Sequence, residues 1–210
     1  MIRMIRRFLA WAMGPLHRLL LRRIVVDDPW EPVTSVLIKP RHFAPGSVRR
    51  FQWYFEGESA VTVRSVDDVC RWLAECRYAS DEHLFNESDF WQHPRLFEKL
   101  RQGDCEDHAL WAWRKLVELG HRASLHVGKW QGGHHAWVVF ERDGQQLLLE
   151  PVDKDSATAV RPLPEVRGEY MPHFSVDEAF KVRSHAGYLV HVQERAGIAP
   201  RPQALDLKVS

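Results

Sequence analysis

The stretch between residues 105 and 150 constrains the fold most, because its hydrophobic pattern changes from the spacing of a helix to that of strands. Apolar residues recur at helical spacing from about Cys105 to Leu119, and Gly120 stops the helix. Three strand-like runs follow, at residues 123–129, 136–142 and 145–150. A helix followed by consecutive strands predicts an α+β domain in which the helix packs on an antiparallel sheet.

The turn between the last two of these strands fixes which side chains share a face. Asp143-Gly144 is a favoured dipeptide for a two-residue hairpin turn. With that turn, Glu150 lies opposite Trp137 and therefore on the same face as His135. The two residues are diagonal neighbours, about 7–8 Å apart at the backbone, so a Glu150–His135 hydrogen bond is within reach.

Asp153 is the alternative acidic partner of His135. It falls on the opposite face if the turn has two residues, but a bulged turn would reverse that parity. The sequence therefore favours Glu150 and keeps Asp153 as the reserve.

Cys105 stands where a thiol can become a nucleophile. At the first turn of a helix, unpaired backbone N–H groups and the positive end of the helix dipole favour the thiolate. Asp104, Glu106 and Asp107 oppose this effect with negative charge. A histidine partner is needed as general base or as imidazolium, and His135 is the candidate.

These residues carry a resemblance to a known family. Residues 103–109, Gly-Asp-Cys-Glu-Asp-His-Ala, resemble the cysteine motif of transglutaminase-like domains. His135-Ala136-Trp137 is similar to their histidine strand, and Glu150-Pro151 to their Asp-Pro, with Glu in place of the usual Asp. The spacing is most similar to bacterial transglutaminase-like cysteine peptidases, which also have an aromatic-Pro-acid segment like residues 91–98.

The resemblance implies a papain-like fold and a Cys-His-Glu catalytic triad. In it Cys105 is the nucleophile, His135 the base and Glu150 the orienting residue. The family requires no cofactor, although some members bind calcium through acids beside the cysteine, at positions that match Asp104 and Glu106. Zinc is disfavoured, because the chain offers no Cys-x-x-Cys or His-x-x-x-His pair around Cys105.

The expected reaction is acyl transfer on a protein or peptide substrate. A cysteine protease that hydrolyses peptide or isopeptide bonds through a thioester is the first expectation. A cross-linking acyltransferase of the transglutaminase type is the alternative within the same chemistry. A catalytically silent peptide-binding domain is the alternative from another class.

The composition indicates which partners and which cellular compartment to expect. The 210 residues carry a formal net charge of +1, so nucleic acid is not expected as a partner. Three cysteines make a poor disulfide framework and favour a reducing, cytoplasmic location. Residues 1–26 are basic and apolar but contain no run of roughly twenty apolar residues, so they predict peripheral contact with a membrane or a protein.

The chain divides into three parts by composition. Residues 1–46 read as the basic amphipathic segment and a Pro-rich linker, 47–195 as the catalytic domain and 196–210 as a tail. Within these parts we expect helices at 65–77 and 95–100, loop-like residues at 151–172 and a short helix at 176–182. We expect short strands at 34–38, 48–54, 60–63 and 188–192.

Overall fold

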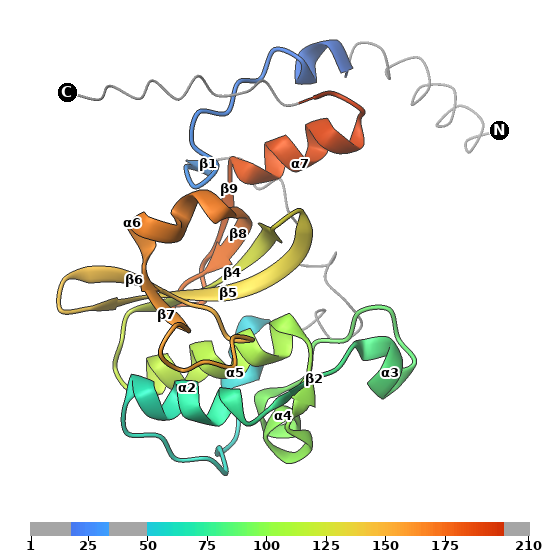
Figure 1. Ribbon diagram of the computed structural model, residues 1–210. Coiled ribbons are helices and arrows are strands. Elements are labelled where there is room, and N and C mark those ends of the chain that lie inside the picture. Colours follow the sequence, from blue (N-terminus) through green and yellow to red (C-terminus); the bar gives the residue numbers. More distant parts are fainter. Residues whose placement is uncertain (1–17, 34–49, 200–210) are drawn as a thin grey trace.

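A seven-stranded antiparallel sheet forms the centre of the protein (Figure 1). The computed structural model describes residues 18–33 and 50–199, and the strand expected at 34–38 lies outside them. The sheet order is β1-β9-β8-β4-β5-β6-β7. Its strands are β1 (Pro32–Val33), β4 (Ala123–Trp130), β5 (Gly133–Arg142), β6 (Gln145–Leu149), β7 (Val160–Pro162), β8 (Tyr170–Val176) and β9 (Val182–His185).

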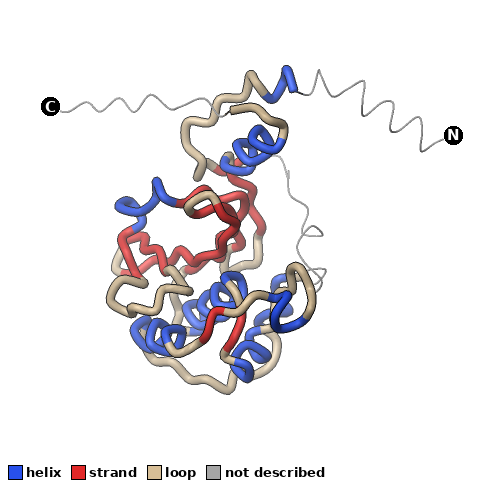
Figure 2. Tube along the Cα trace, turned by 45° about the vertical axis from the view of Figure 1, so that its right-hand side comes forward, coloured by secondary structure: helices blue, strands red, loops and turns tan. Residues whose placement is uncertain are grey.

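A helical layer covers one face of this sheet, as Figures 1 and 2 show. The layer comprises α2 (Val66–Ala74), α3 (Asp81–Phe85), α4 (Pro94–Leu100) and α5 (Cys105–Glu118), and a short parallel strand pair, β2 (Arg77–Tyr78) with β3 (Gln102–Gly103). Helix α5 packs on β4 and β5 and fully buries Trp111, Trp113 and Leu116. The predicted α+β arrangement, a nucleophile-bearing helix on an antiparallel sheet, is confirmed.

The predicted hairpin register is confirmed as well. Arg142 pairs with Gln145 and Val138 with Leu149, and both turn residues, Asp143 and Gly144, have positive φ. The helix expected at 65–77 is α2, where the Ser65 side chain accepts a hydrogen bond from the backbone N–H of Asp68 at 3.1 Å. Helix α4 fills the position expected for 95–100.

The strand pair expected at 48–54 and 60–63 is wrong. Residues Phe51–Phe55 form a 3-10 helix, η2, which buries the rings of Phe51 and Tyr54 against the aromatic core. Residues 60–63 form no strand because buried side chains of the helical layer take their backbone bonds. Glu98 accepts from the N–H of Ala60 at 2.9 Å, and Lys115 donates to the carbonyl of Val61 at 2.7 Å.

The C-terminal third also differs from expectation. Residues 151–172 are not all loop, since they contain β7, α6 (Leu163–Val166), a 3-10 turn (Arg167–Glu169) and the start of β8. The helix expected at 176–182 is instead the turn between β8 and β9, and the strand expected at 188–192 lies within α7 (Gly187–Arg195). Helix α7 packs on β8 and β9, so tertiary contacts override the strand propensity of its Val and Tyr residues.

The second face of the sheet is covered by α6 and residues of the N-terminal segment. Strand β1 pairs with β9, and the Trp30 indole N–H donates to the carbonyls of Arg167 and Tyr170, each at 3.0 Å. Trp30 thereby packs over Trp137 of β5. No helix in the described part of the chain has the length and apolar character needed to cross a bilayer.

Candidate active site

Cys105 is the first residue of α5, and the loop before it is held by Asp107. The Asp107 carboxylate is fully buried and accepts from the backbone N–H groups of Gln92 at 2.7 Å and Asp104 at 3.3 Å. A Cβ on Gly103 would lie 2.3 Å from that carboxylate, so only glycine fits there. The Gly-Asp-Cys-x-Asp pattern is thus explained by one side chain that anchors the start of the helix.

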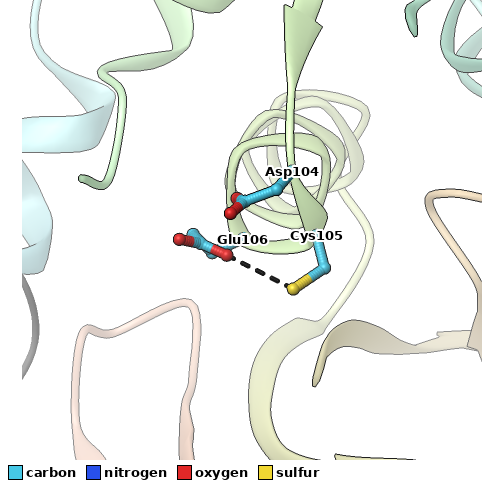
Figure 3. A group of neighbouring side chains, drawn as sticks. All are labelled: Asp104, Cys105 and Glu106. Carbon is cyan, nitrogen blue, oxygen red and sulfur yellow. Dashed lines mark hydrogen bonds between the residues drawn. The ribbon is translucent and has the colours of Figure 1, made fainter. Parts of the chain in front are cut away.

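The thiol lies between an acidic group and the strand that carries His135. Its Sγ donates to Glu106 Oε2 at 3.3 Å, and Figure 3 shows the carboxylates of Asp104 and Glu106 on the same side of the helix start. Burial first, and then the charges of Glu106 and Asp104, raise the pKa of Cys105 well above its usual value. The backbone N–H of Ala136, the residue after His135, acts in the opposite direction and lowers the pKa of Cys105.

His135 is held by a buried carboxylate. Its Nε2 lies 2.9 Å from both oxygens of Glu150, and both side chains are buried. Glu150 also accepts from the hydroxyl of Tyr170 at 2.9 Å and from the backbone N–H of Val152 at 3.3 Å. Because Nε2 is engaged in this way, Nδ1 is the ring nitrogen left for a reaction partner.

Aromatic rings fix the plane of this imidazole. The Trp130 ring centroid lies 5.1 Å from that of His135, and the Trp137 ring is stacked at 6.3 Å. Tyr170 closes the same pocket by packing against both tryptophans. The tryptophans of β4 and β5 therefore wall the histidine side of the site.

Asp153, the reserve for the third position, bonds within its own loop. Its carboxylate accepts from the backbone N–H of Asp155 at 2.9 Å and from the hydroxyl of Thr158 at 2.8 Å. The acid that contacts His135 in this structure is Glu150, on the face that the hairpin register predicts.

Asp104 and Glu106 belong to a larger acidic cluster next to the thiol. Ligand atoms of Asp104, Cys105 and Glu106 lie within 4.8 Å of one another. The same holds for two further trios, Asp81 with Asp104 and Asp107, and Asp81 with Asp89 and Glu106. Burial raises the pKa of Asp81 to about 6 and that of Glu106 well above its usual value. Within the described residues, one buried oxygen of Asp81 and one of Asp104 have no hydrogen-bond partner.

Three contributors to the site carry no local signal in the sequence. Asp81 and Asp89 lie 24 and 16 residues before Cys105, and Tyr170 lies twenty residues after Glu150. Each reaches the site only because a separate loop or strand folds over it. The Pro and the aromatics of residues 91–98 were the one sign that this upstream segment belongs to the site.

Residues 89–183 match the model of the CEP76 peptidase-like domain, which spans the cysteine motif, the histidine strand and Glu150. This match to a peptidase-like domain agrees with the resemblance that the motifs indicated.

Solved structures of Legionella pneumophila LapG are among the similar ones. One is 17% identical and covers 80% of this chain and 97% of its own, with a TM-score of 0.46. A calcium-bound LapG structure is 18% identical and covers 64% and 75%, with a TM-score of 0.45. None of the curated proteins matches this chain.

Proposed function

We propose that the protein is a cysteine-dependent hydrolase of peptide or isopeptide bonds, with Cys105 as nucleophile and His135 as proton carrier. The observation that carries the proposal is the buried pair of Glu150 with His135 of β5, the strand on which α5 packs with Cys105 at its first turn. Glu150 engages Nε2, and the backbone N–H of Ala136, the residue after His135, lowers the pKa of the Cys105 thiol. This arrangement supports a Cys-His pair whose imidazole is oriented by a carboxylate.

The chemistry follows from these positions. Sγ of Cys105 attacks the amide carbonyl carbon while its proton passes to His135. His135 returns that proton to the amide nitrogen, the C–N bond breaks, and an amine leaves a thioester on Cys105. Water, deprotonated by His135, then attacks the thioester and releases a carboxylic acid and the free thiol.

The acidic cluster fits a calcium ion held by Asp104 and Glu106. Calcium prefers carboxylate oxygens, and the cluster brings several of them together, some buried and without another partner. A bound calcium ion supplies positive charge next to the thiol, which offsets the carboxylates there. Thermal unfolding tests this binding directly. Calcium is expected to raise the Tm of the wild type but not of Glu106→Gln.

An amine can replace water as the acceptor of the thioester. The product is then a cross-link rather than a cleaved chain, and the same Cys105 and His135 serve both outcomes. We favour hydrolysis because the matched family is described as peptidase-like. A protein or peptide substrate is proposed for the same reason.

Residues 1–26 are proposed to contact a membrane surface or a protein. In the described part of this segment, Leu19, Leu20 and Val25 are exposed next to Arg22 and Arg23. Exposed apolar side chains among arginines are suited to an anionic, partly apolar surface.

The proposed function is tested by trapping the acyl-enzyme. The chain is incubated with a library of peptides in calcium-containing buffer, and Cys105 is followed by mass spectrometry after rapid acid quenching. We expect a thioester on Cys105 and cleaved peptides, with a lysine-mimicking amine forming little product. Cys105→Ser should abolish cleavage.

Two results would count against hydrolysis. Cleavage that survives in Cys105→Ser would exclude the thiol mechanism. Tight peptide binding without thioester or cleavage, equal in wild type and Cys105→Ser, would instead identify a binding domain.

A further inference from the structure

Three histidines from distant parts of the chain gather next to the active-site strand. His134 comes from β5, His173 from β8 and His191 from α7. Their ring centroids are separated by 6.1 Å (His134–His173), 5.6 Å (His134–His191) and 4.7 Å (His173–His191). Figure 1 shows α7 beside β8 and β9, and this packing brings the third histidine to the other two.

The spacing matches that of imidazoles around one metal ion. A zinc ion binds histidine nitrogens at about 2.0–2.1 Å, which in tetrahedral geometry separates the ring centroids by about 5 Å. The observed separations lie on both sides of that value. The ring nitrogens of the three histidines do not all lie within 4.8 Å of one another in this arrangement. Metal binding therefore requires rotation of at least one ring.

The ring positions allow such a rotation. His173 is only 6% exposed and is held in β8, whereas His134 is exposed near the open end of β5 and His191 is half-buried. Turning an imidazole by 180° about its Cβ–Cγ bond exchanges nitrogen and carbon positions without moving the ring. The outer two histidines can therefore adapt to the fixed one.

Two ring nitrogens of the cluster lack a partner. Among the described residues, His173 Nε2 and His191 Nδ1 are buried atoms with no hydrogen bond. A buried polar atom without a partner costs about 1–3 kcal/mol, and such atoms are rare in folded proteins. A metal ion would use both nitrogens.

The charges around the cluster are compatible with a cation. Lys129 lies nearby, but it is ion-paired with Glu194, which stands three residues after His191 on α7. Residues three apart lie on one helix face, so the Glu194 carboxylate is next to the cluster and offsets the lysine charge. All three candidate ligands are nitrogen donors, which suit zinc, nickel or copper rather than calcium.

We propose that His134, His173 and His191 form a site for one divalent transition-metal ion of the zinc class, which clamps α7 onto the sheet. His134 adjoins His135, so the clamp would also brace the strand that carries the active-site histidine. This site is separate from the oxygen-rich cluster at Asp104 and Glu106, and the proposal does not depend on the proposed hydrolase activity.

Zinc binding to the metal-free full-length chain tests the proposal. The titration uses the Cys105→Ser chain in saturating calcium, so that neither the active-site thiol nor the acidic cluster contributes. Isothermal titration calorimetry should give one zinc ion per chain with a Kd in the micromolar range or tighter. His134→Gln and His191→Gln should each weaken binding at least tenfold (about 1.4 kcal/mol), whereas His121→Gln, a histidine at the other end of the sheet, should change nothing.

Cobalt gives a second readout that does not rely on the variants. Bound Co²⁺ should show the visible absorption of a tetrahedral site without a thiolate charge-transfer band. The proposal is overturned if zinc binds no more tightly than millimolar, or if either His134→Gln or His191→Gln binds zinc as the parent chain does.

Discussion

At the residue scale, the hydrogen bonds of Glu150 support its proposed role as the residue that orients His135, where the resembled family has aspartate. Its longer side chain reaches from the end of β6 to His135 and places both oxygens 2.9 Å from Nε2. Tyr170 and the backbone N–H of Val152 fix the carboxylate from other sides. These hydrogen bonds hold the longer glutamate side chain in one conformation.

Replacing this positioning residue should lower turnover more than stability. Glu150→Gln keeps the shape but leaves His135 without a carboxylate, so kcat should fall by roughly 100-fold or more. Glu150→Asp should restore part of the loss, because the charge returns although the reach is shorter. Steady-state kinetics and Tm are measured on both variants. An equal loss of kcat in Glu150→Gln and Glu150→Asp, or a large fall of Tm in both variants, would indicate a purely structural role.

The sequence predicted this pair because a two-residue turn fixes side-chain parity across a hairpin. It could not predict Tyr170 or Asp81, since each joins the site through contacts between segments far apart in the chain. The three-histidine cluster was missed for the same reason. The sequence pattern placed His134 beside His135 but said nothing about His173 or His191.

At the element scale, the sheet depends on a close approach between β4 and β8. The register shifts at Val127/Gly128, where the two backbones come together. A Cβ on Gly128 would lie 2.1 Å from the carbonyl oxygen of Met171 and 2.8 Å from the Cα of Pro172. Both are backbone atoms, so neither can turn away.

Gly128→Ala should therefore destabilise the fold by about 1–3 kcal/mol, as forced overpacking does. Gly133→Ala is the matched control, because a Cβ there meets only one atom, at an ordinary 3.8 Å. Urea unfolding of both variants gives the comparison. A Gly128→Ala variant with the same urea midpoint as the wild type would contradict the close approach of β4 and β8 at this residue.

Elements with their own local signals were predicted well, and elements defined by packing were not. Helix α5 and the β5–β6 hairpin carry caps, stops and turn residues within their own sequence. By contrast, α7 reads as a strand because of its Val and Tyr residues, and only its contact with β8 and β9 makes it helical. Residues 51–55 read as a strand and form a 3-10 helix because their rings fill the core.

At the scale of the whole molecule, the second face of the sheet buries titratable groups under the N-terminal segment. His126 stacks on Trp137, contacts Trp30 and bonds Ser124 at 2.9 Å. Burial, and then the nearby His185, lower the pKa of His126 well below its usual value. His185 is in turn bonded to the carbonyl of Trp30 at 2.8 Å, so the same segment covers both rings.

This burial predicts a loss of stability in acid. Because the folded-state pKa of His126 is lowered, the unfolded chain takes up the proton first as the pH falls below 6.5. The free energy of unfolding is therefore not reduced by this histidine above pH 6.5. Below pH 6.5 it declines by up to about 1.4 kcal/mol per pH unit for each such histidine. His126→Gln should unfold with a shallower dependence on pH between about pH 6.5 and 5. Urea unfolding across that range checks this, and identical slopes would contradict it.

The central claim is that Cys105 and His135 form the reactive pair, and the rate at which iodoacetamide alkylates each cysteine tests it most directly. The reaction is run at neutral pH in calcium-containing buffer, and peptide mass spectrometry gives the rate for each cysteine. Cys70 and Cys76 serve as internal references, since both are buried whereas Cys105 is half-buried. The account predicts that Cys105 reacts at least tenfold faster than either. It also predicts that His135→Ala removes most of this advantage while His121→Ala does not. A Cys105 that reacts as slowly as the other two, or equally fast without His135, would contradict the assignment of this pair as the reactive centre.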